Sequence, residues 1–272
     1  MKKIFPVLIA ALLFVSVNGF GAPYSDPNKT KMTITVTTAN IGEIVKTVGG
    51  DKVDVAILLK PLSCPSNNDI TPEMVERAKK SNLILSHKWE KWLNKLKIEA
   101  GDRGKLYKQV ETEGNWMIPH IHIRAAEEIL ILLSRLDIEN SGYYEQNYTE
   151  YVYNINSAAK TIQKEIGDEA YGVKVVSNEM IKDFLESYGF EVVATYGKQE
   201  DLTAKKMAYL LSEGKKHSVK IVVDNLQSGA GTGRELAESI GAKQAVISNF
   251  ILGKSYINTL KDNVLRLQKV LQ

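Results

Sequence analysis

The chain has 272 residues, of which 44% are apolar, and its formal net charge at pH 7 is +3. This length and composition supply enough core for one large domain or two modest ones. The charge is almost balanced and no basic stretch is interleaved with aromatic residues, which argues against a nucleic-acid-binding protein. The single cysteine, Cys64, excludes an internal disulfide and a zinc site built from several cysteines.

The first 21 residues are typical of a secretory signal peptide. Two lysines precede an apolar run over residues 4–17, and the small residues Gly19 and Gly21 follow it. The run is shorter than a comfortable membrane span. We therefore expect cleavage after Gly21 and export to the periplasm or the cell surface. The alternative is that the segment is retained as an anchor, whereas a lipid-anchored form is disfavoured because no cysteine sits at the junction.

Residues 32–139 alternate between strand and helix patterns. Strands rich in β-branched residues are predicted at 32–39, 53–60, 82–86 and 105–110. Helices are predicted at 41–48, from Thr71 onward, at 89–98 and at 123–136. Thr71, Pro72 and Glu73 suit a helix start, with an N-cap, a proline at the first position and an acid in the first turn. The alternation predicts a mostly parallel sheet covered by helices, which forms an N-terminal lobe.

A long helix is predicted across residues 140–168. Apolar and aromatic side chains recur there at steps of three and four between Tyr144 and Ile166. Such a helix is longer than a crossover between strands requires. A coiled-coil dimer would show the same stripe, but a strut across two lobes of a monomer fits better, because the strand–helix alternation restarts directly afterwards.

Residues 172–272 repeat the alternation. Strands are predicted at 172–178, 191–196, 220–225 and 244–250, and helices at 180–188, 203–212, 233–240 and 253–271. The predicted fold class is therefore α/β, with two Rossmann-like lobes joined by a long backbone helix. Clefts between domains are where ligands usually bind.

Several segments together resemble one protein family. They are Ala39 to Val53 (ANIGEIVKTVGGDKV), Thr71-Pro72, Leu85 to Leu93 (LSHKWEKWL), Trp116 to Pro119 (WMIP), the Tyr-rich long helix, Ser187 to Phe190 (SYGF) and Gly241 to Lys243 (GAK). The chain resembles the zinc and manganese solute-binding proteins of ABC transporters (cluster A-I, with a rigid backbone helix) from Met32 to Gln272. The resemblance implies an extracytoplasmic, non-enzymatic component of an importer, with an ABC permease as partner and zinc or manganese as the family-typical ligand. No nucleophile with a plausible base and no hydrolase motif points to an enzyme.

The metal ligands that the resemblance implies are replaced in this chain. The family uses three His, the third sometimes a Glu, and one Asp, and these positions fall on Ser66, Gly114, Asn178 and Ser248. Neutral oxygen atoms are poor zinc ligands compared with imidazole, thiolate or carboxylate. We therefore expect the fold to carry over and the metal site to be atypical, suited to a chelated metal or another small ligand. No resident cofactor is indicated beyond a possible divalent metal.

The candidate ligand-binding residues follow strand ends or the aligned motifs. They are Ser66, Asn67, His87, Trp116, Asn178, Glu179, Asp224, Ser248 and Asn249. His87 is also the tentative metal ligand, because it ends a predicted strand and side chains at strand ends point toward a cleft. We expect Ser66, Asn178 and Ser248 to converge on the cleft with His87 nearby. A surface role for His87 and structural ion pairs for Glu179 and Asp224 are the alternatives.

Four further features have mainly structural interpretations. His120 and His122 are expected at a helix start and on the surface, because a spacing of two puts them on different faces. His217 is expected to be solvated, and Cys64 to be buried and inert rather than a thiolate ligand. The run Gly229 to Gly233 could present backbone N–H groups to an anion, although a plain connector is commoner.

The alternative to a transport function is an adhesion or scaffold protein that keeps the fold without the ligand.

Overall fold

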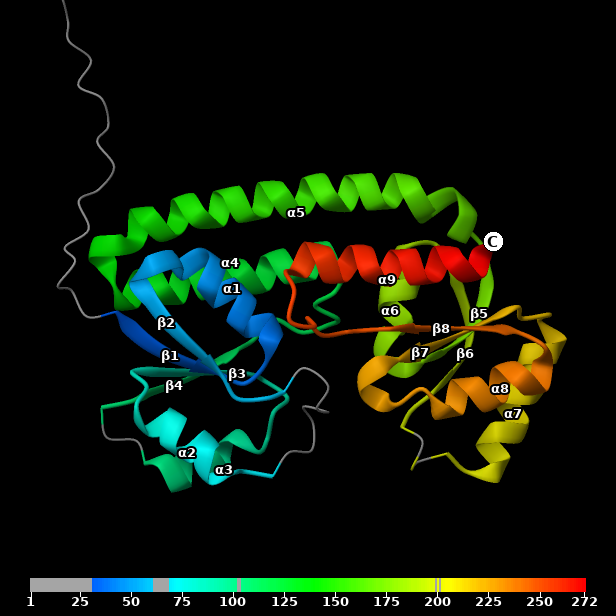
Figure 1. The fold of residues 1–272 in the computed structure, drawn as a ribbon, viewed down its shortest axis with the longest axis horizontal. Coiled ribbons are helices and arrows are strands. Elements are labelled where there is room, and N and C mark those ends of the chain that lie inside the picture. The colour runs from blue at the N-terminus through cyan, green and yellow to red at the C-terminus, as the bar shows by residue number, and fades with distance from the viewer. Residues whose placement is uncertain (1–30, 61–68, 102–103, 199, 201) are drawn as a thin grey trace, which may run out of the picture. The chain divides into compact units, whose positions relative to one another are not determined.

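A computed structural model describes residues 31–60, 69–101, 104–198, 200 and 202–272 (Figure 1). The expected signal peptide over residues 1–21 lies outside this part of the chain. Among the described residues, none of the helices combines the length and the apolar character that a membrane crossing needs.

The first sheet is parallel and has the strand order β2-β1-β3-β4. Its strands are β1 (Met32–Val36), β2 (Val53–Ile57), β3 (Leu83–His87) and β4 (Leu106–Val110). The helices around it are α1 (Ala39–Gly49), α2 (Pro72–Lys79), α3 (Leu93–Ala100) and α4 (Pro119–Leu136). Alternate residues of β3 face opposite sides: Leu83 and Leu85 pack with α1 and α4, and Ile84 packs with α2 and α3. Helices therefore cover both faces, as predicted for a buried parallel sheet.

The second sheet repeats this arrangement with the order β6-β5-β7-β8. Its strands are β5 (Lys174–Asn178), β6 (Glu191–Tyr196), β7 (Ile221–Asn225) and β8 (Lys243–Ile247). The helices are α6 (Lys182–Ser187), α7 (Ala204–Lys216), α8 (Gly231–Ile240) and α9 (Tyr256–Leu271). Val175 packs toward α6 and α9, and Val176 packs toward α7 and α8. Short 3₁₀ turns occur at Gly50–Lys52, Ile138–Asn140, Glu179–Ile181 and Leu226–Ser228. The predicted fold class is confirmed.

The long helix α5 (Ser141–Ala170) has 30 residues and buries the predicted stripe. Tyr144, Tyr151, Ile155, Ile162 and Ile166 are buried. The hydrophobic cluster that they join contains residues of both sheets, so the two halves share one continuous core. Hydrogen bonds fasten the helix at two distant points, from Asn147 Nδ2 to Val48 O and from Gln268 Nε2 to Glu165 O, both 3.0 Å.

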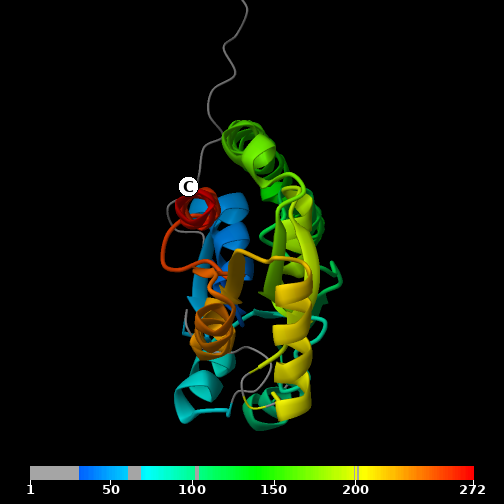
Figure 2. The same ribbon diagram turned by 90° about the vertical axis from the view of Figure 1, so that its right-hand side faces the viewer.

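The last helix, α9, connects the two halves a second time. It lies beside α5 in both views (Figures 1 and 2). Its first residue, Tyr256, donates a hydrogen bond through its hydroxyl to Met117 O of the N-terminal half, at 2.9 Å. We propose residues 32–139 and 172–272 as the two lobes. The helix α9 then belongs to the second lobe by sequence, although its first turn packs on the first lobe.

Two helix starts differ from the sequence prediction by four residues. The helix predicted at 89–98 begins only at Leu93, because residues 88–92 form turns in which Glu90 accepts the His87 backbone N–H at 2.7 Å. The helix predicted from residue 123 begins at Pro119, a favoured first position. It therefore includes His122, which lies four residues before Ala126 of the predicted apolar face and is fully buried. The expectation that His122 lies on the surface was wrong, whereas His120 is exposed.

The shared core can be tested on α5 itself. Ile155 is fully buried, so Ile155→Ala removes three methyl or methylene groups from the interior and should lower the free energy of unfolding by about 3 kcal/mol. Tyr153 is 72% exposed on the same helix, so Tyr153→Ala should change it by less than about 0.5 kcal/mol. Urea unfolding of both variants measures the difference. Equal losses would contradict the assignment of the buried face.

Candidate functional site

A cavity of about 230 Å³ lies where the two halves meet. The strand order reverses in each sheet, between β1 and β3 and between β5 and β7. Ligands in parallel α/β sheets bind outside the carboxyl ends of the strands at such points. The described residues that line the cavity are Asn40, His87, Trp89, Gly114, Asn115, Trp116, Glu179, Met180, Asp183, Asn249 and Phe250. Segments that follow β1, β3, β4, β5 and β8 thus contribute to one site.

His87 forms part of an aromatic cluster in the wall of the cavity. Its ring stacks on Trp89, with centroids 5.0 Å apart and an interplanar angle of 17°, and it meets Trp116 edge-on at 4.4 Å. Phe250 approaches from the other half at 6.4 Å. The imidazole Nε2 is hydrogen-bonded to Thr38 Oγ1 at 2.9 Å. Burial lowers the pKa of His87 to about 3, so the ring is neutral at physiological pH.

Glu90 supports the backbone beneath His87. Its Oε2 accepts hydrogen bonds from the His87 N–H at 2.7 Å and from Thr37 Oγ1 at 2.6 Å. Burial raises the pKa of Glu90 to about 7, against the opposing effect of hydrogen bonds from Thr37, the His87 N–H and Trp92. The carboxyl group therefore titrates near neutral pH directly behind the cavity wall.

Asparagine side chains join the two halves around the cavity. Asn40, buried at the start of α1, donates to Asn249 O at 3.3 Å and accepts from Ile251 N at 2.9 Å. Asn115 donates to Met180 O at 2.9 Å. Each bond pairs a side chain of one half with the backbone of the other, so it fixes the loops that carry Asn249 and Met180.

A second buried polar group lies between α1, α4, α5 and the start of α9. Glu43 Oε1 accepts from Tyr256 N at 3.1 Å, and its other carboxylate oxygen accepts from Tyr151 Oη. The Tyr151 hydroxyl also meets His122 Nε2 at 2.8 Å, and the His122 ring stacks on Tyr256 at 3.8 Å. Burial acts to raise the pKa of Glu43, but hydrogen bonds from His122 and Tyr151 outweigh it, so this pKa lies below its ordinary value. Sequence reasoning missed this group, because its members are far apart in the chain.

The structure brings four of the predicted site residues to the cavity wall. They are His87, Trp116, Glu179 and Asn249. Two others, Ser66 and Asn67, lie outside the described residues, as does Cys64.

Three predicted site residues do not line this cavity, because their side chains satisfy local backbone groups or neighbouring side chains. Asn178 donates to Gly197 O at 3.1 Å and accepts from Met180 N at 3.0 Å. The Ser248 hydroxyl accepts from Gln227 Nε2 at 2.8 Å and donates to Phe250 O at 2.6 Å. The expected convergence of Asn178 and Ser248 with His87 is therefore not seen for their side chains, although each lies next to a residue of the cavity wall.

The third, Asp224, belongs to β7, and its carboxylate bonds to the N-terminal turn of α8. It accepts from Tyr196 Oη and Gln244 Nε2, both at 2.6 Å, and from Gly233 N at 3.2 Å. A β-carbon at Gly233 would lie 1.9 Å from Asp224 Oδ2, so this glycine is what lets the carboxylate approach. One backbone N–H of the glycine run, that of Gly233, is therefore bonded to Asp224 rather than open to an external anion, which favours the connector interpretation.

The residues at the expected metal positions do not suit a bare metal ion. Gly114 has no ligating side chain and a φ of +102°, and a β-carbon there would lie 2.8 Å from Ile121 Cδ1. No cluster of three or more His, Cys, Asp or Glu residues is placed to hold a metal within the described part of the chain. His217, which was expected to be solvated, is partly exposed, and its Nε2 lies 3.3 Å from Glu213 Oε2.

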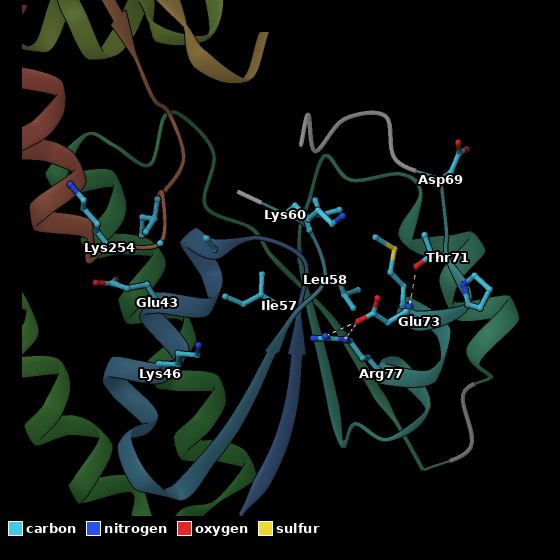
Figure 3. A pocket seen from close by; sticks show the side chains of 16 residues that line it. Glu43, Lys46, Ile57, Leu58, Lys60, Asp69, Thr71, Glu73, Arg77 and Lys254 are labelled. Carbon is cyan, nitrogen blue, oxygen red and sulfur yellow. Dashed lines mark hydrogen bonds and ion pairs between the residues drawn. The ribbon is translucent and has the colours of Figure 1, made fainter. Parts of the chain in front are cut away.

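A larger cavity, of about 830 Å³, lies beside α1, α2 and the loop before α9 (Figure 3). Three of its charged groups form ion pairs: Arg77 bonds to Glu73 at 2.8 Å and Lys254 to Asp262 at 2.7 Å. Lys60 and Asp69 border it, and residues 61–68 between them lie outside the described residues. We therefore assign no site there.

The model of the zinc-uptake complex component A periplasmic family matches residues 34–270. The chain belongs to this family. It is 21% identical to the high-affinity zinc uptake system protein ZnuA of Bacillus subtilis (strain 168), over 95% of this chain and 94% of that one. It is 25% identical to the manganese ABC transporter substrate-binding lipoprotein PsaA of Streptococcus pneumoniae, over 70% of each chain. The fold matches a periplasmic metal-binding protein from Candidatus Liberibacter asiaticus with a TM-score of 0.76 and 17% identity, over 89% of this chain and all of that one. The matched family consists of solute-binding transport proteins rather than enzymes.

The pKa of Glu90 predicts a pH dependence of stability. Between about pH 4.5 and 7 the folded state keeps a proton that the unfolded state releases, so stability falls as pH rises, by at most about 3 kcal/mol. Glu90→Gln should remove this contribution. The free energy of unfolding of the variant, relative to that of wild type, should therefore increase as the pH rises from 5 to 8. Denaturant unfolding at both pH values measures the change. Glu99→Gln, at an exposed position of α3, is the control, and a pH profile of Glu90→Gln parallel to wild type would contradict the assignment.

Proposed function

We propose that this chain is the extracytoplasmic solute-binding component of an ABC importer and that it captures its solute in the cavity lined by His87, Trp116, Glu179 and Asn249. The observation that carries the proposal is that both halves supply walls to one cavity at the switch points of their sheets. Family membership supports the transport role. The predicted signal peptide supports export to the periplasm or the cell surface.

The proposed mechanism is capture with little domain movement. The helix α5 has few soft dihedral angles, and the hydrogen bonds of Asn40 and Asn115 join the halves on the cavity side. Solute binding would then produce small rocking motions and local loop adjustments rather than a wide hinge closure. An importer would recognise the solute-loaded form through those adjustments.

The importer assignment predicts a functional interaction with a membrane transporter. We expect genes for a permease and an ATPase beside the gene for this chain, and the purified chain should stimulate the ATPase activity of the importer that they encode, reconstituted in nanodiscs. Heat-unfolded chain is the control. An adhesion or scaffold protein would give neither a complex with the permease nor stimulation, and that result would refute the importer assignment.

We propose that the solute of this site differs from the free metal ion that is typical of the family. The described cavity offers a free metal ion one imidazole, whose Nε2 already contacts Thr38, and carboxylates that do not cluster around it. Stripping water from a divalent cation is costly, and anionic ligands normally offset that cost.

We therefore expect weak binding of free metal. Zn²⁺ and Mn²⁺ should bind at least about a hundredfold more weakly than to a relative that retains the three His and one Asp, a loss of about 2.7 kcal/mol or more. Calorimetry at neutral pH on chelator-treated full-length protein, with that relative measured in parallel, gives the comparison. Nanomolar zinc binding by the unmodified chain would show that a metal site has been rebuilt elsewhere.

A further inference from the structure

We propose that the cavity takes a small organic cation bearing N–H groups, such as an alkylammonium or a guanidinium, in place of a bare divalent metal ion. This inference rests on the solute-binding function proposed above and names the class of solute. Three independent features of the cavity wall lead to it: its aromatic faces, its charge and one unpartnered polar atom.

The aromatic wall suits a cation. Trp89, Trp116 and Phe250 surround His87, and Trp89 remains 44% exposed although its ring stacks on the imidazole. An occupant of the cavity can therefore reach the indole of Trp89. Indole rings are the strongest partners in cation–π interactions, because the face of the ring carries negative electrostatic potential.

The charge of the wall has the matching sign. Glu179 and Asp183 line the cavity from the segment after β5 and from α6, and no lysine or arginine occurs among its described lining residues. Neither carboxylate forms an ion pair with a described cation. The two acids therefore leave the cavity with a net negative charge that an organic cation would neutralise.

The unpartnered atom defines the hydrogen bonding that the occupant must supply. Asn249 is only 8% exposed and lines the cavity, and its Oδ1 has no hydrogen-bond partner within the described structure. This oxygen is itself shielded within the wall, and a polar atom buried without a partner costs free energy, so a rotation of the Asn249 amide that brings it to an N–H of the occupant is favoured. The amides of Asn40 and Asn115 cannot substitute for it, because they already bond across the two halves.

The size of the cavity limits the occupant. Cavities for drug-sized ligands measure roughly 300–1,000 Å³. At about 230 Å³ this cavity suits a smaller molecule, but it exceeds what one metal ion would fill. Gly114 contributes to this space, because no side chain projects from the position where the family resemblance places a histidine.

The test is calorimetry on the dialysed, chelator-treated full chain. The probes are n-butylammonium and methylguanidinium chloride, with 1-butanol and N-methylurea as neutral analogues and zinc chloride as the metal. We expect saturable binding of at least one cation with a Kd below about 1 mM, and binding of the neutral analogues at least about tenfold weaker. Trp89→Leu should weaken cation binding by about three- to thirtyfold, because it removes the cation–π contact at a partly exposed position.

Charge variants separate a specific site from general attraction. Glu179→Gln combined with Asp183→Asn should weaken cation binding by at least about threefold. Glu186→Gln is the matched control on α6, since Glu186 pairs with Lys182 outside the cavity wall, and it should leave the affinity unchanged.

Three results would overturn the inference: no binding of either cation, equal affinity for cations and neutral analogues, or no effect of Trp89→Leu and the charge variants. The ATPase assay is independent of these results. Stimulation of the importer together with any of them would show that the solute class is wrong and the importer function is right.

Discussion

Hydrogen bonds between the two halves are the constraint on which the cavity depends. Asn40 holds the loop after β8, Asn115 holds the segment after β5, and Glu43 accepts from the first backbone N–H of α9. All of these partners come from opposite halves of the chain. The Asn40 bond is buried, so breaking it leaves a polar group without water, which costs more than the bond itself contributes. The halves are therefore held in one arrangement, and the small cavity between them keeps its shape.

The shared hydrophobic core reinforces this constraint. One cluster of buried side chains runs from the first sheet along α5 to the second sheet. Two lobes that share a core and two connecting helices move less freely than lobes joined by strands alone. For the proposed solute capture, we therefore expect specificity to depend mainly on which side chains line the cavity, and less on how far the lobes close around different ligands.

Some polar residues at the strand ends bond to neighbouring protein groups, whereas others line the cavity. Asn178, Asp224 and Ser248 follow the same topological rule as His87 and Asn249, but their polar atoms bind nearby backbone and side-chain groups. A position that in a metal-binding relative would point a ligand into the cleft can thus stabilise a turn. The adjacent residues Glu179 and Asn249 lie at the cavity in their place. In the proposed site, this shift by one residue puts a carboxylate and an amide at the wall, next to the positions where the family resemblance implies metal ligands.

The sequence by itself determined the fold class, the long helix and the regions of the site. Hydrophobic periodicity is local, so the stripe from Tyr144 to Ile166 predicted α5, and strand ends predicted that His87 and Glu179 lie near a cleft. It did not determine side-chain partners, because these depend on residues brought together by the fold. The burial of His122 against Tyr151 and Tyr256 involves three helices, and the engagement of Ser248 by Gln227 joins two loops. Whether a polar side chain faces a solute or a neighbouring peptide group was decided only by the tertiary structure, since it depends on which donor or acceptor lies within hydrogen-bonding distance.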